Sequence, residues 1–245
     1  MDFANQSVLL VSGTARSARA MARSVAANGG DVAFTYHEDE AKADALLDEL
    51  EGEGHASWRC DVTDGDRVDE VVNAAFDDRH IDSLVYSVGV FTDTPIDGGD
   101  RAEWAWQLEA NATGAYHVLG AAAPRLKSQG KGAICALSAS AGMLRGPEFA
   151  GFDASKVALE ALVMEAAREL GPHGIRANVV APGYMRTPAE LSDEELEAFY
   201  DQTALDRICL DEDVAAVTLF LCSDYARQMT GAVVPVDGGM SITGP

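Results

Sequence analysis

Short apolar runs alternate along the chain with longer stretches whose apolar residues recur at helical spacing. The runs occupy residues 7–12, 31–36, 56–60, 83–87, 132–138, 176–181 and 232–236, and the helical stretches occupy residues 18–28, 40–51, 67–78, 101–127, 155–170 and 211–224. Strands that alternate with helices pair in parallel, because each helix carries the chain back to the edge where the last strand began. The pattern predicts an α/β fold, a doubly wound parallel sheet of about seven strands with helices on both faces.

The length favours one domain over the whole chain, residues 1–245. Open α/β sheets of this size form around one core, and no Pro-rich linker, tandem repeat or low-complexity run divides the sequence. In such sheets the ligand binds at the carboxyl ends of the strands, near the switch in strand order. The residues that follow each strand are therefore the candidates for function.

The charge balance excludes some partners. The chain carries 18 basic and 40 acidic residues, a net charge of -22, which repels nucleic acid and anionic lipid. The acidic residues are spread over several segments, which is typical of solvated helix faces rather than of a cation site. The start has neither a basic segment nor an apolar one, and no stretch reaches the ~18 apolar residues of a membrane span, so we expect a cytoplasmic protein with no membrane or nucleic-acid partner.

The sequence holds no pattern of metal ligands. Cys60, Cys135, Cys209 and Cys222 are far apart and lack C-x-x-C spacing, which indicates buried reduced thiols rather than disulfides or zinc ligands. The five histidines form no H-E-x-x-H or comparable pattern. We expect no metal.

The first strand runs into residues 12–19, Ser-Gly-Thr-Ala-Arg-Ser-Ala-Arg. A dinucleotide-binding loop is expected at this place, with glycines that let the backbone approach a pyrophosphate at the helix N-terminus. Only Gly13 is present. A phosphate cradle and a plain turn between strand and helix both remain open.

Several segments, in order and spacing, resemble the short-chain dehydrogenase/reductase family over essentially the whole chain. They are C-D-V-T at 60–63, N-A-T-G at 111–114, A-S-K at 154–156, R-A-N-V-V-A-P-G at 176–183, T-G at 230–231 and V-D-G-G at 236–239. The resemblance implies a Rossmann-type fold, a homo-tetramer or homo-dimer, a nicotinamide cofactor and a small-molecule substrate.

By this resemblance Asp61 contacts the adenine, Lys156 holds the nicotinamide ribose, and Pro182, Gly183 and Thr187 flank the carboxamide. The full set of implied cofactor contacts is Gly13, Arg16, Asp61, Gly89, Lys156, Pro182, Gly183 and Thr187. The second strand ends in Thr-Tyr-His at 35–37, without the acidic residue that would bind a ribose 2′-OH. With Arg16 nearby, this favours NADPH over NADH.

The chain also departs from the family pattern. T-G-x-x-x-G-x-G is one residue short here, and Ala18 replaces its last glycine, so we expect NADP(H) to bind weakly or to have been lost. The segment Tyr-Ser-Val-Gly at 86–89, with the spacing from Phe149 to Lys156, is similar to bacterial enoyl-acyl-carrier-protein reductases.

The catalytic motif Y-x-x-x-K reads F-D-A-S-K at 152–156, and the enoyl-reductase form of the motif places Phe149 at the tyrosine. The usual serine falls on Ala139, and period-2 alternation turns Ser138 and Ser140 away from its face. A phenyl ring cannot transfer a proton. The catalytic candidates that remain are Lys156, Asn111 and Ser138, and the candidate pocket residues are Ser140, Phe149, Phe152 and Tyr184, with Tyr86 as a further polar group.

Three functions are compatible with these features. The first is an NADPH-dependent reductase of an enone or carbonyl compound, with water, Lys156 or the substrate as proton source. The second is a non-redox protein that catalyses an elimination, cyclisation or isomerisation, or only binds a ligand. The third is a silent partner that pairs with an active homologue through the helices at 101–127 and 155–170.

Overall fold

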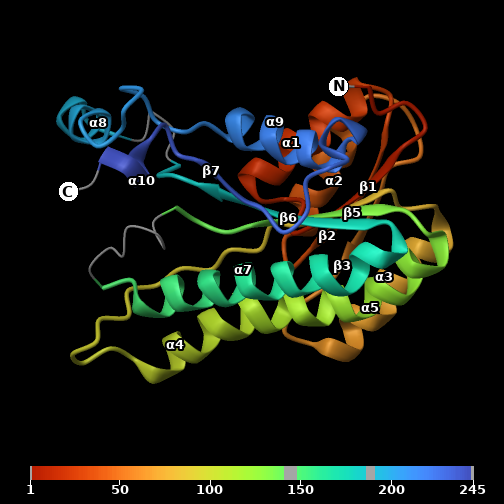
Figure 1. The fold of residues 1–245 in the computed structure, drawn as a ribbon, viewed down its shortest axis with the longest axis horizontal. Coiled ribbons are helices and arrows are strands. Elements are labelled where there is room, and N and C mark those ends of the chain that lie inside the picture. Colours follow the sequence, from red (N-terminus) through yellow and green to blue (C-terminus); the bar gives the residue numbers. More distant parts are fainter. Residues whose placement is uncertain (1, 141–147, 186–190, 244–245) are drawn as a thin grey trace.

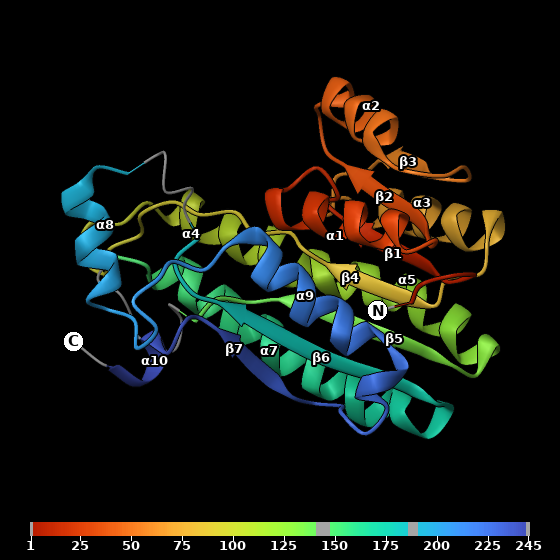
Figure 2. The same cartoon turned by 90° about the horizontal axis from the view of Figure 1, so that it is seen from above.

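The computed structural model describes residues 2–140, 148–185 and 191–243, and contains seven parallel strands in one sheet (Figures 1 and 2). The strands are β1 (Ser7–Val11), β2 (Asp31–Tyr36), β3 (Ala56–Arg59), β4 (Ser83–Tyr86), β5 (Gly132–Leu137), β6 (Ile175–Pro182) and β7 (Val233–Val236). Their order is β3-β2-β1-β4-β5-β6-β7. The order reverses direction between β1 and β4, so the predicted doubly wound sheet is confirmed.

Helices cover both faces of the sheet (Figure 1). The helices α1 (Arg16–Ala27), α2 (Glu40–Glu49) and α9 (Asp211–Cys222) pack on one face. The helices α3 (Gly65–Asp78), α5 (Gly114–Gln129) and α7 (Ala150–Leu170) pack on the other, with α4 (Arg101–Leu108) against α7. Two short helices, α8 (Asp193–Tyr200) and α10 (Met240–Thr243), lie near the carboxyl ends of β6 and β7.

Alternating side chains of each strand fill the two layers of the core. Leu9 and Val11 join the cluster under α3, α5 and α7, while Val8 and Leu10 join the cluster under α1 and α9. A parallel sheet covered on both faces requires strands that are apolar at consecutive positions. This explains why the first pattern along the chain is a series of unbroken apolar runs.

Several helices differ from the prediction by more than a shift of one or two residues at their ends. The stretch 101–127 is interrupted by a π-helical turn, Glu109–Thr113, between α4 and α5. Helix α7 begins at Ala150 rather than 155, which places Phe152 inside its first turn. Helix α8 was not predicted, although Ser192 and Glu195 form a capping box at its start.

No helix in the described part of the chain is long and apolar enough to cross a membrane. The described residues also contain no group of three or more His, Cys, Asp or Glu side chains that could bind a metal ion. All four cysteines are buried free thiols.

Candidate active site

Lys156 lies at the carboxyl ends of β4 and β5, on the side of α7 that faces the sheet. Its side chain is 3% exposed, and Nζ donates to the carbonyl oxygens of Val88 at 2.9 Å and Leu137 at 3.0 Å. Burial lowers the pKa of Lys156 to about 8, and the carboxylate of Glu160, one turn further along α7, partly opposes this shift. The structure thus holds a buried amine whose pKa lies well below that of an exposed lysine.

Asn111 is fully buried in the π-helical turn and ties three segments together. Its Oδ1 accepts from the Val90 backbone N–H at 2.8 Å, and its Nδ2 donates to the Val90 carbonyl at 2.9 Å and to Ser155 Oγ at 2.9 Å. A π-bulge shifts the side chains that follow it and is frequent at functional sites. Asn111 therefore fixes the loop after β4 against α7, on which Lys156 lies.

The side chains around Lys156 form an aromatic surface. The Phe91 ring makes edge contacts with Phe149, at 4.9 Å between ring centres, and with Phe152, at 5.3 Å. Lys156 Nζ lies 5.7 Å from the centre of the Phe152 ring. Both candidate tyrosine positions are thus occupied by rings without a hydroxyl, and they share one contact partner, the half-exposed Phe91.

The three residues that follow β5 continue its hydrogen bonding to β6. Ser138 N–H donates to the Val180 carbonyl at 2.8 Å, and Ser140 N–H donates to the Pro182 carbonyl at 2.6 Å. This agrees with the expected alternation, in which Ala139 faces the other way. Ser138 Oγ donates to Glu160 Oε1 at 2.6 Å, and the fully buried Ser140 Oγ makes no hydrogen bond among the described residues.

At the tip of β2 the structure forms a pocket of about 280 Å³ between β1, β2, β3 and β4. Asp61 lines it and accepts from the backbone and hydroxyl of Thr63 at 2.9 and 2.8 Å, with His37 Nε2 at 3.3 Å from its carboxylate. Burial raises the pKa of Asp61, but the hydrogen bonds from Thr63 and the contact with His37 outweigh burial and hold it below its usual value. Gly89 lies on the Lys156 side of this pocket.

The turn after β1 is tightly packed. A Cβ added at Gly13 would lie 2.4 Å from Phe34 Cβ, and Ser12 has the left-handed φ of 68°, which is uncommon for a residue other than glycine. Packing against Phe34 is therefore a sufficient reason for glycine at position 13, with or without a phosphate.

Arg16 was expected beside the tip of β2, but its Nε lies 3.1 Å from Asp211 Oδ2 at the start of α9. Ser17 Oγ donates to the other oxygen of the same carboxylate at 3.0 Å. The structure does not bring Arg16 together with Asp61 and His37. The basic residue beside the β2 tip is Arg59, the last residue of β3, whose Nε donates to the His37 carbonyl at 3.1 Å.

Beyond β6, Gly183 approaches the segment after β7 so closely that an added Cβ would lie 2.8 Å from Asp237 Cα. Pro182 ends β6, and Tyr184 contacts Phe199 of α8 at 4.8 Å between ring centres. Thr187 lies outside the described residues. Tyr86 donates its phenol hydrogen to the Ala110 carbonyl and is buried, so it does not reach the aromatic surface.

Comparison with known proteins identifies the family. The chain matches the family described as "Enoyl-(Acyl carrier protein) reductase" over residues 13–241. It belongs to the short-chain dehydrogenase/reductase family. The 3-oxoacyl-[acyl-carrier-protein] reductase FabG of Staphylococcus aureus (strain Mu50 / ATCC 700699) is 33% identical over 237 residues, which cover 94% of this chain and 96% of that protein.

Other members act on different compounds. L-rhamnose 1-dehydrogenase (NAD(P)(+)) of Sphingomonas sp. (strain SKA58) is 31% identical over 250 residues, which cover 97% of this chain and 96% of that protein. The crystal structure of NAD+-bound xylitol dehydrogenase has a TM-score of 0.89 and 27% identity, and covers 98% of this chain and 100% of that one. The predicted family is confirmed, and its members use nicotinamide cofactors with different small molecules.

Sequence reasoning missed Glu160, Phe91 and His37. Glu160 stands four residues after Lys156, so helical spacing alone could have found it. The position of Phe91 depends on the loop that Asn111 holds, and no local pattern in the sequence encodes this long-range contact.

Proposed function

We propose that this chain is an NADP(H)-dependent oxidoreductase that reduces an enone or carbonyl group of a small molecule without the hydroxyl pair of Tyr and Ser. The observation that carries this proposal is the position of Lys156, a buried amine beside the phenyl ring of Phe152 and the backbone of the β4 and β5 loops. Lys156, Asn111 and the loop after β4 fit the ribose half of a nicotinamide cofactor.

The pocket at the tip of β2 fits the adenine half. Asp61 and Thr63 line it, His37 directly follows β2, and Arg59 ends the neighbouring β3, while β2 itself ends without a carboxylate. A 2′-phosphate is favoured by the Arg59 guanidinium and by a hydrogen bond from the His37 ring, and it is disfavoured by an acidic residue. We therefore propose a preference for NADPH that rests on His37 and Arg59 rather than on Arg16.

The phosphate-binding turn supports weak binding. Helix α1 has no acidic residue in its first turn and no side-chain cap, so the N–H groups at its start can donate hydrogen bonds to an anion. The Asp211 carboxylate, however, lies within hydrogen-bond reach of Ser17 in that same turn. A negative charge at this place opposes the binding of a pyrophosphate.

When bound, the cofactor supplies the hydride. The residues of this chain then position the substrate and manage protons: the phenyl rings of Phe149 and Phe152 form an apolar wall, and Lys156 is a cation that attracts a developing negative charge. Enone reduction suits this site, because solvent can protonate an enolate after hydride transfer. Direct carbonyl reduction leaves an alkoxide, and we assign its stabilisation to Lys156.

Titration calorimetry with NADPH and NADH tests the cofactor proposal. We expect weak binding of NADPH and weaker binding of NADH, and we expect Lys156→Ala to reduce the affinity at least tenfold, equivalent to ~1.4 kcal/mol. Single-turnover mixing of NADPH with a panel of enones then measures reduction. A protein that binds neither cofactor at millimolar concentration would favour the non-redox alternative, an elimination, cyclisation or isomerisation in the same pocket.

The helices on one face support a homo-oligomer. Trp104, Trp106, Tyr116, Val157 and Met164 of α4, α5 and α7 are exposed, and contiguous exposed apolar side chains mark interaction sites. We propose a homo-dimer or homo-tetramer through this surface. Sedimentation analysis of Tyr116→Glu with Met164→Glu tests it, and an unchanged molecular mass in the double variant would exclude this interface.

A further inference from the structure

We propose that the aromatic surface of Phe91, Phe149 and Phe152 binds an organic cation with an iminium group, C=N⁺, and that hydride transfer to the carbon of that group is the reaction this surface serves. This rests on the proposed use of NADPH. The inference comes from the identity of the groups around Lys156 and from the charge of the loops at that end of the molecule.

The proton balance favours this substrate. When a hydride adds to the carbon of a neutral ketone, the oxygen becomes an alkoxide and needs a proton from the protein or solvent. When the hydride adds to the carbon of an iminium ion, the C=N π electrons move to nitrogen as a lone pair, the positive charge disappears, and a neutral amine leaves with NADP⁺. No proton is transferred, so phenyl rings at both tyrosine positions cost this reaction nothing.

The aromatic surface has the chemistry to bind a cation. Phe91, Phe149 and Phe152 come from the loop after β4 and the start of α7, and meet edge to face. The face of a phenyl ring is negative, and a cation within about 6 Å of its centre gains about 0.5–2 kcal/mol. Lys156 Nζ already lies 5.7 Å from the centre of the Phe152 ring, so the rings left for a cationic ligand are those of Phe91 and Phe149.

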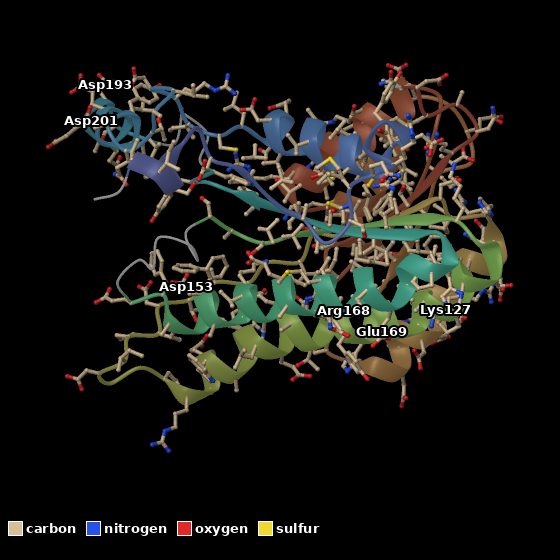
Figure 3. The ribbon with its side chains drawn as sticks, viewed as in Figure 1. Lys127, Asp153, Arg168, Glu169, Asp193 and Asp201 are labelled. Atoms are coloured by element: carbon tan, nitrogen blue, oxygen red, sulfur yellow. The ribbon has the colours of Figure 1, made fainter. Side chains whose placement is uncertain are left out.

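The segments around the aromatic surface carry more acidic than basic residues. Residues 90–100, 148–155 and 191–206 contain Asp and Glu side chains but no Lys or Arg, although Arg101, Lys156 and Arg207 directly follow these segments and Arg145 and Arg186 lie in the sequence between them. Figure 3 places Asp153, in the first turn of α7, at the same end of the molecule as Asp193, the first residue of α8, and Asp201, which follows the last residue of α8. Such a field concentrates cations at the mouth of a pocket and repels phosphorylated or carboxylated substrates.

Lys156 does not contradict a cationic substrate. Its ammonium is bound by two backbone carbonyl oxygens, and the Glu160 carboxylate stands one turn away on the same helix. The two carbonyl oxygens and the Glu160 carboxylate compensate the positive charge of the Lys156 ammonium. The exposed ring of Phe91, by contrast, has no bound cation among the described residues.

The first experiment measures binding without any reaction. N,N-dimethyl-tetrahydroisoquinolinium, which cannot accept a hydride, is titrated calorimetrically into the protein, with neutral tetralone of similar shape as the reference. We expect the cation to bind at least about fivefold more tightly than tetralone. Phe91→Leu should remove most of that preference, whereas Phe91→Tyr keeps the ring and should preserve it.

A matched pair of charge variants tests the acidic field. Asp153→Asn removes one negative charge at the pocket end of α7, and Glu169→Gln removes one at the other end of the same helix (Figure 3). We expect Asp153→Asn to weaken binding of the cation about threefold or more and to leave tetralone binding unchanged. Equal effects of the two variants would show that only the net charge of the protein matters.

The second experiment measures turnover with NADPH. N-methyl-dihydroisoquinolinium should be reduced by the parent, and the ratio of its kcat/KM to that of tetralone should fall at least about tenfold in the double variant Ala139→Ser with Phe152→Tyr, which adds the missing hydroxyls. NADPH binding with reduction of enones or ketones, but no preference for the cation, would overturn the iminium inference and leave the reductase proposal standing. Absence of NADPH binding would overturn the reductase proposal, and the calorimetric preference then decides the cation site by itself.

Discussion

Replacing Lys156 by Met tests whether the buried amine carries the charge that its surroundings indicate. Burial lowers the pKa of Lys156 from 10.5 to about 8. Each pKa unit corresponds to about 1.4 kcal/mol between the protonated and neutral forms. The protonated lysine therefore costs the folded protein about 3 kcal/mol relative to an amine with an unshifted pKa.

The direction of the pH dependence follows from which state binds the proton. Below pH 8 the lysine is charged in both the folded and the unfolded chain, so the full penalty is present. Between pH 8 and 10.5 the folded protein releases this proton while the unfolded chain keeps it, so the free energy of unfolding rises with pH. From pH 7 to about 9.5 the gain is about 2 kcal/mol.

Urea unfolding of the parent and Lys156→Met, followed by the fluorescence of the tryptophans, measures this gain. Cys60, Cys209 and Cys222, whose pKa values are raised by burial to about 11, destabilise the folded state at high pH in both proteins. The contribution of Lys156 is therefore obtained from the difference between the free energies of unfolding of the parent and the variant. Between pH 7 and about 9.5 we expect the free energy of unfolding of the parent to rise by about 2 kcal/mol more than that of Lys156→Met. If the two free energies changed in parallel with pH, the assigned burial of the lysine charge would be refuted.

Three further predictions concern the site. The double variant Ala139→Ser with Phe152→Tyr should reduce simple ketones about 100-fold faster than the parent in an NADPH absorbance assay, and a parent that is already as fast would show that the missing hydroxyls are immaterial. Asn111→Ala removes three hydrogen bonds of a fully buried amide and should lower the free energy of unfolding by about 2–4 kcal/mol; a loss below about 0.5 kcal/mol would contradict its tethering role. Arg59→Ala should lower the ratio of NADPH to NADH affinity at least about threefold by calorimetry, while an unaffected ratio would exclude the β2 tip as its source.

The sheet could be predicted because its signal is local. An apolar run in a strand covered on both faces identifies itself within a few residues, and all seven runs became strands. The start of α7 could not be read in this way. Thr94 accepts from the Gly151 N–H at 2.8 Å and donates its own N–H to the Glu148 carbonyl at 2.7 Å, so a segment distant in sequence determines where this helix begins.

The residues of the candidate site also divide into those that a local pattern predicts and those whose position depends on tertiary contacts. Lys156 and Asn111 stand in motifs whose spacing is encoded locally, and the structure places them on either side of Ser155. Arg16 was expected at the tip of β2 because it follows β1 closely, but its partner, Asp211, is far away in the sequence. Side-chain direction in a loop depends on such tertiary partners, and a pattern of residue types does not encode them.

The energetics of Lys156 bear on whether the pocket is still in use. A methionine of similar shape would remove a penalty of about 3 kcal/mol from a protein whose total stability is expected to be about 5–15 kcal/mol. A buried ionisable group with a perturbed pKa, placed at the carboxyl edge of a parallel sheet, is expected where a ligand uses its charge. The phenyl ring of Phe152 beside the amine lacks the hydroxyl that would donate a proton, so the site has kept a cation and lost a proton donor. Under the proposed function, a buried lysine without the hydroxyl acid is the combination that hydride transfer without protonation requires, whereas a plain binding protein requires neither.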